Sequence, residues 1–260
     1  MSDRTAGEPP FVQSLERGLE VLRALNDSPA SLTLTEIATQ VGMTRAAARR
    51  FLLTLVELGY AGSDDRGFSL RPRVLELGHA YLSSLRLPEV ALPHLERLAA
   101  TVSETTSLTV LDDDEIVYVA RVHGFRILTV SIAVGTRFPA YATSTGRVLL
   151  AGLDADEFEA YFERITPRQL TSGTLTNRER LTQEIARVRR QGWTIVDQEL
   201  EQGLRSIAAP VRDADGRVVA AVNTSTHSSR TSMDTMRRSW LPHLLATADS
   251  IGAELAQTPN

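Results

Sequence analysis

The sequence contains no cysteine, and all 28 of its basic residues are arginine, so lysine is absent as well. Without cysteine the 260-residue chain has no disulfide bond, no reactive thiolate and no Cys-ligated zinc site. Arginine suits phosphate and carboxylate groups better than lysine because its planar guanidinium donates paired hydrogen bonds. The 32 acidic residues leave a net charge of −4. An acidic total does not exclude nucleic-acid binding, which depends on local clusters of positive charge.

The chain also lacks the signatures of several protein classes. No apolar run is long enough to span a bilayer, and residues 1–10 resemble neither a signal peptide nor a transit peptide. There is no P-loop, no Gly-x-Ser-x-Gly elbow and no dinucleotide fingerprint. The five histidines lack the spacing of metal ligands. We therefore expect a cytoplasmic protein that is not an enzyme, contacts no membrane, and carries no cofactor or metal.

Residues 34–58 hold two short helical patterns on either side of a polar break at residues 42–44. Ile37, Ala38 and Val41 recur at helical spacing on one face of the first pattern. Thr44 stands where the second helix should have its N-cap. Two short helices around a glycine turn, with basic residues near the start of the second, are typical of a helix-turn-helix. The second helix of that motif enters the major groove of DNA.

A hairpin pattern follows directly and completes a winged helix-turn-helix. Residues 60–62 and 68–70 are predicted to be strands around a polar turn. Six arginines and three acidic residues give the window 43–73 a charge of +3. The alternative is that these arginines form only the solvated face of a small helical domain. The predicted DNA-binding residues are Thr44, Arg45, Ala46, Arg49, Arg50, Arg66 and Arg71.

The remaining patterns predict two domains and an α+β fold. Residues 1–10 are expected to be a disordered arm, residues 11–71 the winged domain, and residues 72–87 a linker helix that ends before Pro88 and pairs with another subunit. Residues 88–257 should form a sheet, antiparallel or mixed, with helices packed on it. Its strands are expected at 107–111, 116–122, 128–134, 193–196, 206–211 and 217–226, and its helices at 90–104, 143–150, 154–164, 177–191 and 233–255.

A ligand pocket in the second domain is better supported than an active site. Residues 143–146 offer hydroxyl groups and free backbone N–H groups at a helix start, a suitable place for a carboxylate. Asn223 and Ser225 share one face of a strand because strand side chains alternate with a period of two. Each residue alone fits an ordinary structural role, and their convergence is the hypothesis. The predicted effector-binding residues are Thr143, Ser144, Thr145, Gly146, Asp197, Glu199, Arg205, Ser206, Asn223 and Ser225.

With both halves interpreted, residues 11–257 resemble an IclR-type transcriptional regulator. The resemblance is carried by residues 14–22, 34–38, 146–151, 188–193 and 203–211. The run 197–207 is similar to the PcaR, PcaU and PobR branch, which regulates β-ketoadipate and protocatechuate catabolism. The resemblance implies a winged DNA-binding domain, a linker helix and a C-terminal GAF-like effector-binding domain, assembled as a dimer or tetramer.

The resemblance also implies that small acids bind near nine of the ten predicted effector residues, all but Arg205. This chain departs from many relatives at Arg147, where lysine is common, at Ser206, where some have cysteine, and at Asn223, where serine is commoner. One hydroxyl or amide decides which acid has its hydrogen bonds satisfied. We expect a regulator of aromatic-acid genes that binds promoter DNA and responds to an acid of the β-ketoadipate or protocatechuate class. The alternatives are an architectural DNA-binding protein without effector response and a small-acid enzyme fused to a helix-turn-helix.

Overall fold

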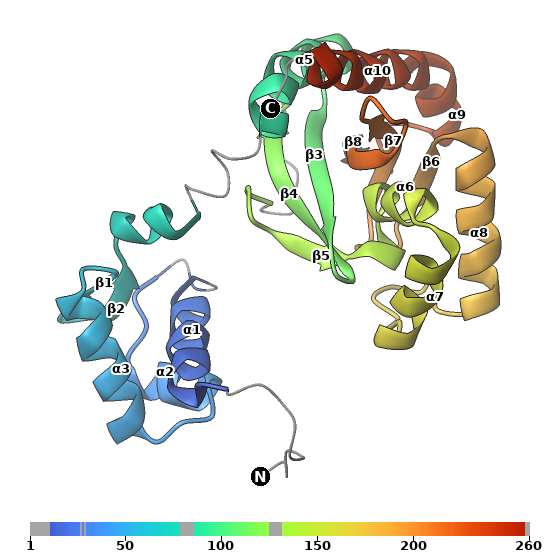
Figure 1. Ribbon diagram of the computed structural model, residues 1–260. Helices are drawn as coiled ribbons and strands as arrows, with labels where there is room; N and C mark the ends of the chain where they lie inside the picture. The colour runs from blue at the N-terminus through green and yellow to red at the C-terminus, as the bar shows by residue number, and fades with distance from the viewer. Residues whose placement is uncertain (1–10, 27, 29, 79–85, 125–131, 258–260) are drawn as a thin grey trace. The chain divides into compact units, whose positions relative to one another are not determined.

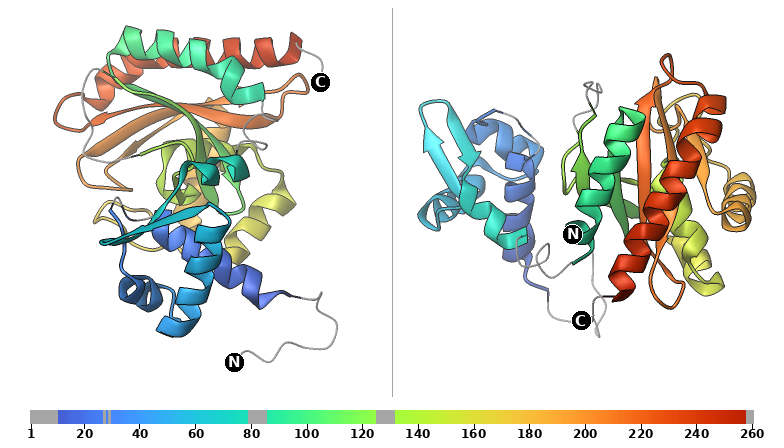
Figure 2. Two further views of the ribbon diagram at one scale, coloured as in Figure 1. Left: turned by 90° about the vertical axis from the view of Figure 1, so that its left-hand side faces the viewer. Right: turned by 90° about the horizontal axis from the view of Figure 1, so that it is seen from above.

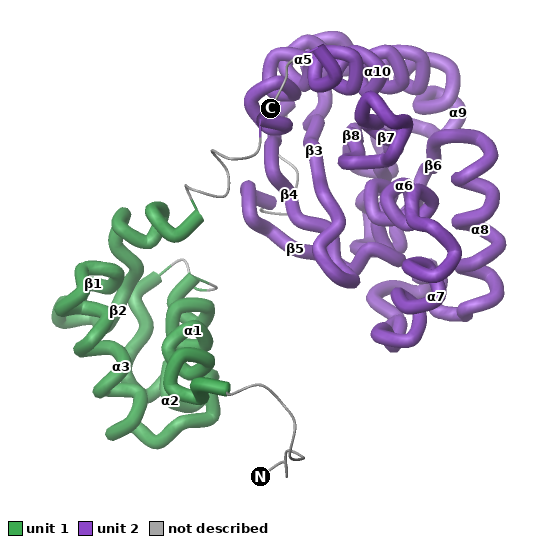
Figure 3. The backbone as a smooth tube through the Cα atoms, viewed as in Figure 1, with its two compact units in different colours: residues 1–83 green, residues 84–260 purple. Residues whose placement is uncertain are grey.

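The computed structural model describes residues 11–26, 28, 30–78, 86–124 and 132–257. The chain divides into two compact units, residues 1–83 and residues 84–260 (Figure 3). The arm expected at residues 1–10 lies outside the described residues.

The first unit is a winged helix-turn-helix, as predicted. Its elements are α1 (Gln13–Asn26), α2 (Leu34–Gln40), α3 (Arg45–Glu57), β1 (Ala61–Asp64) and β2 (Gly67–Leu70) (Figure 1). Thr33 and Glu36 form a capping box at the start of α2, and the Thr44 hydroxyl accepts from the Ala47 N–H at the start of α3. The apolar faces of the three helices meet in one core, which includes Val21, Ile37 and Leu52.

The segment after the wing, expected to be a linker helix over residues 72–87, is described only in part. A 3-10 turn at Pro72–Val74 leads into helical residues 75–78, and residues 79–85 lie outside the described part. Helix α5 (Arg86–Val102) already includes Pro88, which we had placed beyond the end of a helix. Proline is tolerated there because the first N–H groups of a helix have no intrahelical partner. The helix of the second unit therefore starts at Arg86 rather than near Val90.

The second unit is built on a six-stranded antiparallel sheet in the order β5-β4-β3-β8-β7-β6. Helix α5 and the C-terminal helix α10 (Leu241–Gln257) lie side by side over one face (Figures 1 and 2). The opposite face carries α6, α7 and α8, with a second apolar core between these helices and the sheet. The strands are β3 (Thr105–Asp112), β4 (Glu115–Val122), β5 (Arg137–Pro139), β6 (Thr194–Asp197), β7 (Leu204–Arg212) and β8 (Val218–His227). The helices on the second face are α6 (Ser144–Gly152), α7 (Ala155–Arg164) and α8 (Arg178–Gln191).

One predicted strand lies mostly outside the described residues. Of the strand expected at 128–134, residues 128–131 lie outside the described residues, and residues 132–134 form a loop and turn. The strand that pairs with β4 is β5, three residues long and ending at Pro139. A three-residue edge strand that ends in proline is too short to show alternating apolar and polar residues. Hydrophobic periodicity in the sequence therefore does not reveal it.

The long helix predicted over 233–255 is interrupted near its start. A short turn, α9 (Met233–Thr235), leads into a π-helical segment at Met236–Trp240, and α10 follows. Pro242 lies in the first turn of α10, where its ring would clash with the preceding turn of a regular helix. The wider π turn relieves that clash. Neither α10 nor any other described helix is long and apolar enough to cross a membrane.

Candidate functional site

Helix α3 separates an apolar face from a basic one. Ala48, Leu52 and Leu55 are buried in the core of the first unit. The predicted DNA-binding residues of this helix, Arg45, Ala46, Arg49 and Arg50, are all exposed, and Thr44 caps its first turn. None of these three arginines forms an ion pair with a described residue. The helix therefore presents three unneutralised positive charges beside a small side chain that permits close approach.

The wing holds Arg66 at its tip. The Asp64 carboxylate accepts hydrogen bonds from the backbone N–H groups of Arg66, at 2.8 Å, and Gly67, at 3.1 Å. Gly67 has φ of 138°, and a Cβ there would lie 2.3 Å from the Leu32 carbonyl oxygen, so only glycine fits. The Arg66 side chain is 85% exposed and only 3.7 Å from Asp64 at its nearest approach. The turn geometry thus directs a charged side chain into solvent.

Two further arginines lie at the base of the wing. The exposed Arg71 lies against Gly62, where an added Cβ would be 2.7 Å from its Nε atom. Arg73 donates a hydrogen bond of 2.9 Å to the Leu58 carbonyl and lies 5.5 Å from the centre of the Tyr60 ring. Arg73 therefore satisfies a backbone carbonyl at the C-terminal end of α3, whereas the Arg71 side chain stays at the surface, where it can contact a phosphate.

In the second unit a small cavity lies between the start of α6 and the sheet. Its volume is about 10 Å³, room for about one water molecule. Part of its lining comes from Tyr118 and from the apolar residues Ala142, Val196, Leu200 and Leu204. Six of the ten predicted effector-binding residues complete that lining: Thr143, Ser144, Thr145, Ser206, Asn223 and Ser225. Residues far apart in the sequence thus meet at one place.

The cavity has unused hydrogen-bonding capacity. The hydroxyls of Ser144 and Ser206 are 2.7 Å apart, and the Asn223 amide donates to the Ser225 hydroxyl at 2.9 Å. Asn223 Oδ1 is buried and has no partner among the described residues. The backbone N–H groups of Ser144 and Thr145 lie in the first turn of α6, where no intrahelical acceptor exists. A ligand with oxygen atoms and a hydroxyl would satisfy these groups.

Tyr118 was missed as a candidate because a tyrosine in a predicted strand reads as ordinary core. It lines the cavity from β4, and burial raises the pKa of its hydroxyl to about 12. The phenol is therefore protonated at neutral pH and keeps its hydrogen-bond donor.

Gly146 does not line the cavity, although it belongs to the predicted segment. An added Cβ would lie 2.1 Å from the Ala140 carbonyl oxygen, in the 3-10 turn Ala140–Ala142 that precedes α6. The Gly146 N–H donates to the hydroxyl of Thr143, the N-cap residue, at 3.1 Å. In this structure Gly146 allows α6 to pack closely on the turn before it.

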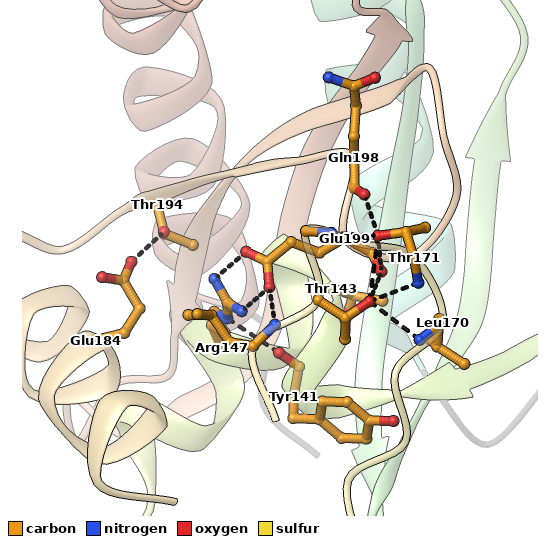
Figure 4. Close-up of polar contacts among 12 residues, drawn as sticks. Tyr141, Thr143, Arg147, Leu170, Thr171, Glu184, Thr194, Gln198 and Glu199 are labelled. Atoms are coloured by element: carbon orange, nitrogen blue, oxygen red, sulfur yellow. Dashed lines mark hydrogen bonds and ion pairs between the residues drawn. The ribbon is translucent and has the colours of Figure 1, made fainter. Parts of the chain in front are cut away.

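Glu199 also lies outside the lining and pairs with Arg147 instead (Figure 4). The guanidinium donates two hydrogen bonds to the carboxylate, at 2.8 and 2.5 Å, and a third to the Tyr141 carbonyl at 3.0 Å. The Leu175 N–H donates to the same carboxylate at 2.9 Å. Arg147 is 2% exposed and Glu199 is 8% exposed. This pair joins α6 to the loop after β6.

The same loop is held from its other side by two hydroxyls (Figure 4). Thr171 donates to the Gln198 carbonyl and Thr174 to the Glu199 carbonyl, each at 2.6 Å. Backbone and side chain of Glu199 are therefore both fixed by partners within the protein.

Asp197 and Arg205 form a second bidentate pair. They are directly opposite on β6 and β7, with hydrogen bonds of 2.7 and 2.9 Å. Arg205 also donates to the carbonyls of Ser228, at 3.3 Å, and Thr231, at 2.6 Å. Of the ten predicted effector-binding residues, Gly146, Asp197, Glu199 and Arg205 are thus not brought to the cavity.

The aspartate-rich turn between β3 and β4 has an ordinary structural role. Arg137 pairs with Asp112 and with Glu115, each at 2.7 Å, and ties β5 to this hairpin. Across the described part of the chain, no group of three or more histidine and acidic side chains is placed to hold a metal ion.

Comparisons with known proteins match both units. The family model described as IclR helix-turn-helix domain matches residues 14–65, and that described as Bacterial transcriptional regulator IclR C-terminal matches residues 79–253. The Pca regulon regulatory protein of Pseudomonas putida is 46% identical over 250 residues, which cover 96% of this chain and 86% of the relative. The p-hydroxybenzoate hydroxylase transcriptional activator of Acinetobacter baylyi is 36% identical over 246 residues, covering 93% and 91%.

A solved structure agrees with these relatives. An IclR homologue from Microbacterium hydrocarbonoxydans, complexed with 4-hydroxybenzoate, has a TM-score of 0.80 and 27% identity, covering 94% of this chain and 99% of that one. Winged helix, six-stranded sheet and cavity therefore occur in a chain that matches this family along nearly its whole length. The chain belongs to the IclR family of bacterial transcriptional regulators.

Proposed function

We propose that this regulator binds a small aromatic carboxylic acid in the cavity below α6 and that the acid controls its binding to promoter DNA. The observation that carries the proposal is the convergence of six predicted residues on one cavity, in which Asn223 Oδ1 has no hydrogen-bond partner from the described part of the chain. Hydroxyls, first-turn N–H groups and the Tyr118 phenol suit the oxygen atoms of a hydroxylated acid. A related regulator named as the transcriptional activator of p-hydroxybenzoate hydroxylase and a homologue complexed with 4-hydroxybenzoate support the aromatic class.

The cavity must open for such an acid to enter. Ligand pockets commonly enclose about 300–1,000 Å³, whereas this cavity has about 10 Å³. Opening separates α6 from the sheet or displaces the loop that carries Leu200 and leads into β7 at Leu204. A ligand that favours the open arrangement shifts the population toward it, and the acid thereby couples to the rest of the protein.

For the DNA-binding unit, we propose that residues 44–46, Arg49 and Arg50 contact the major groove while Arg66 and Arg71 meet phosphates. Regulators with this motif pair to match two half-sites, so we propose a dimer or tetramer acting in the bacterial cytoplasm. The acid would favour or disfavour the half-site spacing of that assembly.

The test is fluorescence anisotropy of the full-length protein on DNA from upstream of its own gene. 4-Hydroxybenzoate, protocatechuate and β-ketoadipate are titrated separately, over a salt series. We expect specific binding that weakens steeply with salt and shifts with 4-hydroxybenzoate or protocatechuate. A shift with β-ketoadipate alone, which has no aromatic ring, would contradict the aromatic class. Asn223→Leu should keep DNA binding and lose the response to acid. An operator affinity that none of the acids changes would contradict the effector proposal.

The second candidate, an architectural DNA-binding protein, predicts the same salt dependence without any response to acid. The convergence of six predicted residues on one cavity favours the effector-responsive interpretation. Incubation with each acid, followed by chromatography, tests the remaining possibility of turnover. We expect the acids to be recovered unchanged.

A further inference from the structure

A strip of buried polar residues extends beyond the cavity across the sheet. In the strand register, Ser107 of β3 lies opposite Asn223 of β8, and Thr105 of β3 lies opposite Ser225. Paired residues share a face, so this strip lies on the same side of the sheet as the cavity. Thr105 and Ser107 are buried. A polar surface thus continues from the cavity lining toward β4.

A bulge in β4 brings Arg121 to that face. The register of β3 and β4 shifts after Leu108, which pairs with Ala120, while Thr109 pairs with Tyr118. Val119 and Ala120 consequently both pack in the core beneath α5 and α10, although neighbours in a regular strand point to opposite faces. Arg121 is then paired with Ser107, on the cavity side. Without the bulge, Tyr118 and Arg121 would lie on opposite faces.

Among the described residues, none neutralises the charge of Arg121. Its Nε atom is buried without an acceptor among the described residues, and no described carboxylate forms an ion pair with it. Burial lowers the pKa of its guanidinium, as expected for a charge that loses water and gains no counter-ion. Thr109 Oγ1 and Asn223 Oδ1 on the same face are also buried and unsatisfied. Native proteins rarely leave such groups unpaired, because each costs free energy.

The other arginines near the cavity are already neutralised. Arg147 is paired with Glu199, and Arg205 with Asp197, each through two hydrogen bonds. An acid that enters the cavity needs a counter-charge, and the N-terminus of α6 supplies only neutral donors. Among these three arginines, Arg121 is the one whose charge is available.

We propose that Arg121 is the residue that binds the effector's carboxylate, with the acid lying across β3 between Arg121 and the hydroxyls at the start of α6. The inference rests on the proposed function. A guanidinium donates two parallel hydrogen bonds to a carboxylate, a strong and directional pairing. Strands lie about 4.8 Å apart, so Arg121 is roughly 10 Å from Asn223 along the sheet, a span that an aromatic ring with polar groups at both ends bridges. Such a ligand has its charge at Arg121 and its hydroxyl at the Ser144–Ser206 pair.

The test is isothermal titration calorimetry of the full-length protein with 4-hydroxybenzoate, protocatechuate and β-ketoadipate, and with 4-hydroxybenzamide as a neutral counterpart. Arg121→Gln should weaken binding of the acid about 10- to 100-fold and change amide binding less than about twofold. Arg190→Gln, at an exposed position of α8, is the matched control and should bind as the wild type does. An Arg121→Gln protein that binds the acid as tightly as the wild type would overturn the inference while leaving the proposed function intact.

If the wild type itself binds none of the acids, the proposed function fails and the inference falls with it. A melting curve without ligand separates binding from a structural role. Arg121→Gln should melt no lower than the wild type, because it removes an unpaired, partly buried charge. A clear fall in melting temperature, or failure to fold, would assign Arg121 to the structure instead. Arg121→Lys, which keeps the charge but not the paired donors, should show an intermediate loss of affinity for the acid.

Discussion

Arg147 and Glu199 form a buried bidentate ion pair that joins the first turns of α6 to the loop after β6. Both ends of the pair have additional backbone partners, the Tyr141 carbonyl for the arginine and the Leu175 N–H for the glutamate. The pair therefore holds the helix that roofs the cavity against the loop that forms part of its wall.

The first prediction concerns the stability that this pair provides. Glu199→Leu should lower the free energy of unfolding by about 3–5 kcal/mol, since it leaves Arg147 buried without a counter-charge. The double variant Arg147→Met/Glu199→Leu should recover most of that loss, because it removes both desolvated charges. Urea unfolding followed by circular dichroism measures both values. Glu163→Leu, exposed on α7, is the control for the loss of one carboxylate.

A double variant as unstable as the single one would mean that the backbone contacts of the pair, rather than its charges, stabilise the loop.

The second prediction distinguishes residues of the winged domain that contact DNA bases from residues that contact phosphates. Arg49→Ala should weaken operator binding by about 1–3 kcal/mol, and more for the specific site than for random DNA. Arg66→Ala should weaken binding to the operator and binding to random DNA to a similar extent. It should also reduce the slope of log affinity against log salt concentration by about one. Anisotropy titrations at four salt concentrations measure these effects, with Arg190→Ala as a control. Unchanged affinity for Arg49→Ala would refute its place in the groove.

The third prediction tests why Gly146 is required. Gly146→Ala should destabilise the protein by about 1–3 kcal/mol, because the new methyl group would collide with the Ala140 carbonyl, 2.1 Å away. Gly78, whose added Cβ would meet nothing within 4 Å, offers the matched control in a helical segment. Gly78→Ala should be neutral or stabilise by up to about 1 kcal/mol. The melting temperatures of the two variants should differ from that of the wild type in opposite directions or by clearly different amounts.

The fourth prediction concerns alkaline pH. Burial raises the pKa of Tyr118 to about 12, above the value near 10 of an exposed tyrosine, so folding favours its protonated form. The associated stability is fully present below about pH 10 and is lost as the pH rises toward 12. At pH 11 the loss from this group is about 1.4 kcal/mol.

Tyr118→Phe should therefore reduce the fall in stability between pH 9 and pH 11, as measured by urea unfolding. It should not abolish that fall, since burial also raises the pKa of Tyr161. An identical pH dependence in variant and wild type would show that Tyr118 does not titrate as a buried phenol.

Local patterns in the sequence determined the winged domain almost completely. The N-cap at Thr44, the glycine turn before it and the apolar stripe on α3 act over distances of a few residues, so helix bounds and the basic face follow from composition and spacing. The same holds for α8, which begins after Asn177 and ends at Gly192 in the left-handed conformation. The sequence pattern of a helix N-terminus also identified residues 143–146 as candidates. Six of the predicted effector-binding residues line one cavity in the structure.

The tertiary structure decided what those patterns left open. The sequence offered Asp197, Glu199 and Arg205 as ligand residues, but their partners depend on strand register and on Arg147, which lies 52 positions from Glu199. The bulge that turns Arg121 toward the cavity is a mismatch between two strands, and neither strand reveals it alone. Contacts between distant segments follow from how sheets and helices pack, and charges that look available in sequence are often neutralised by that packing.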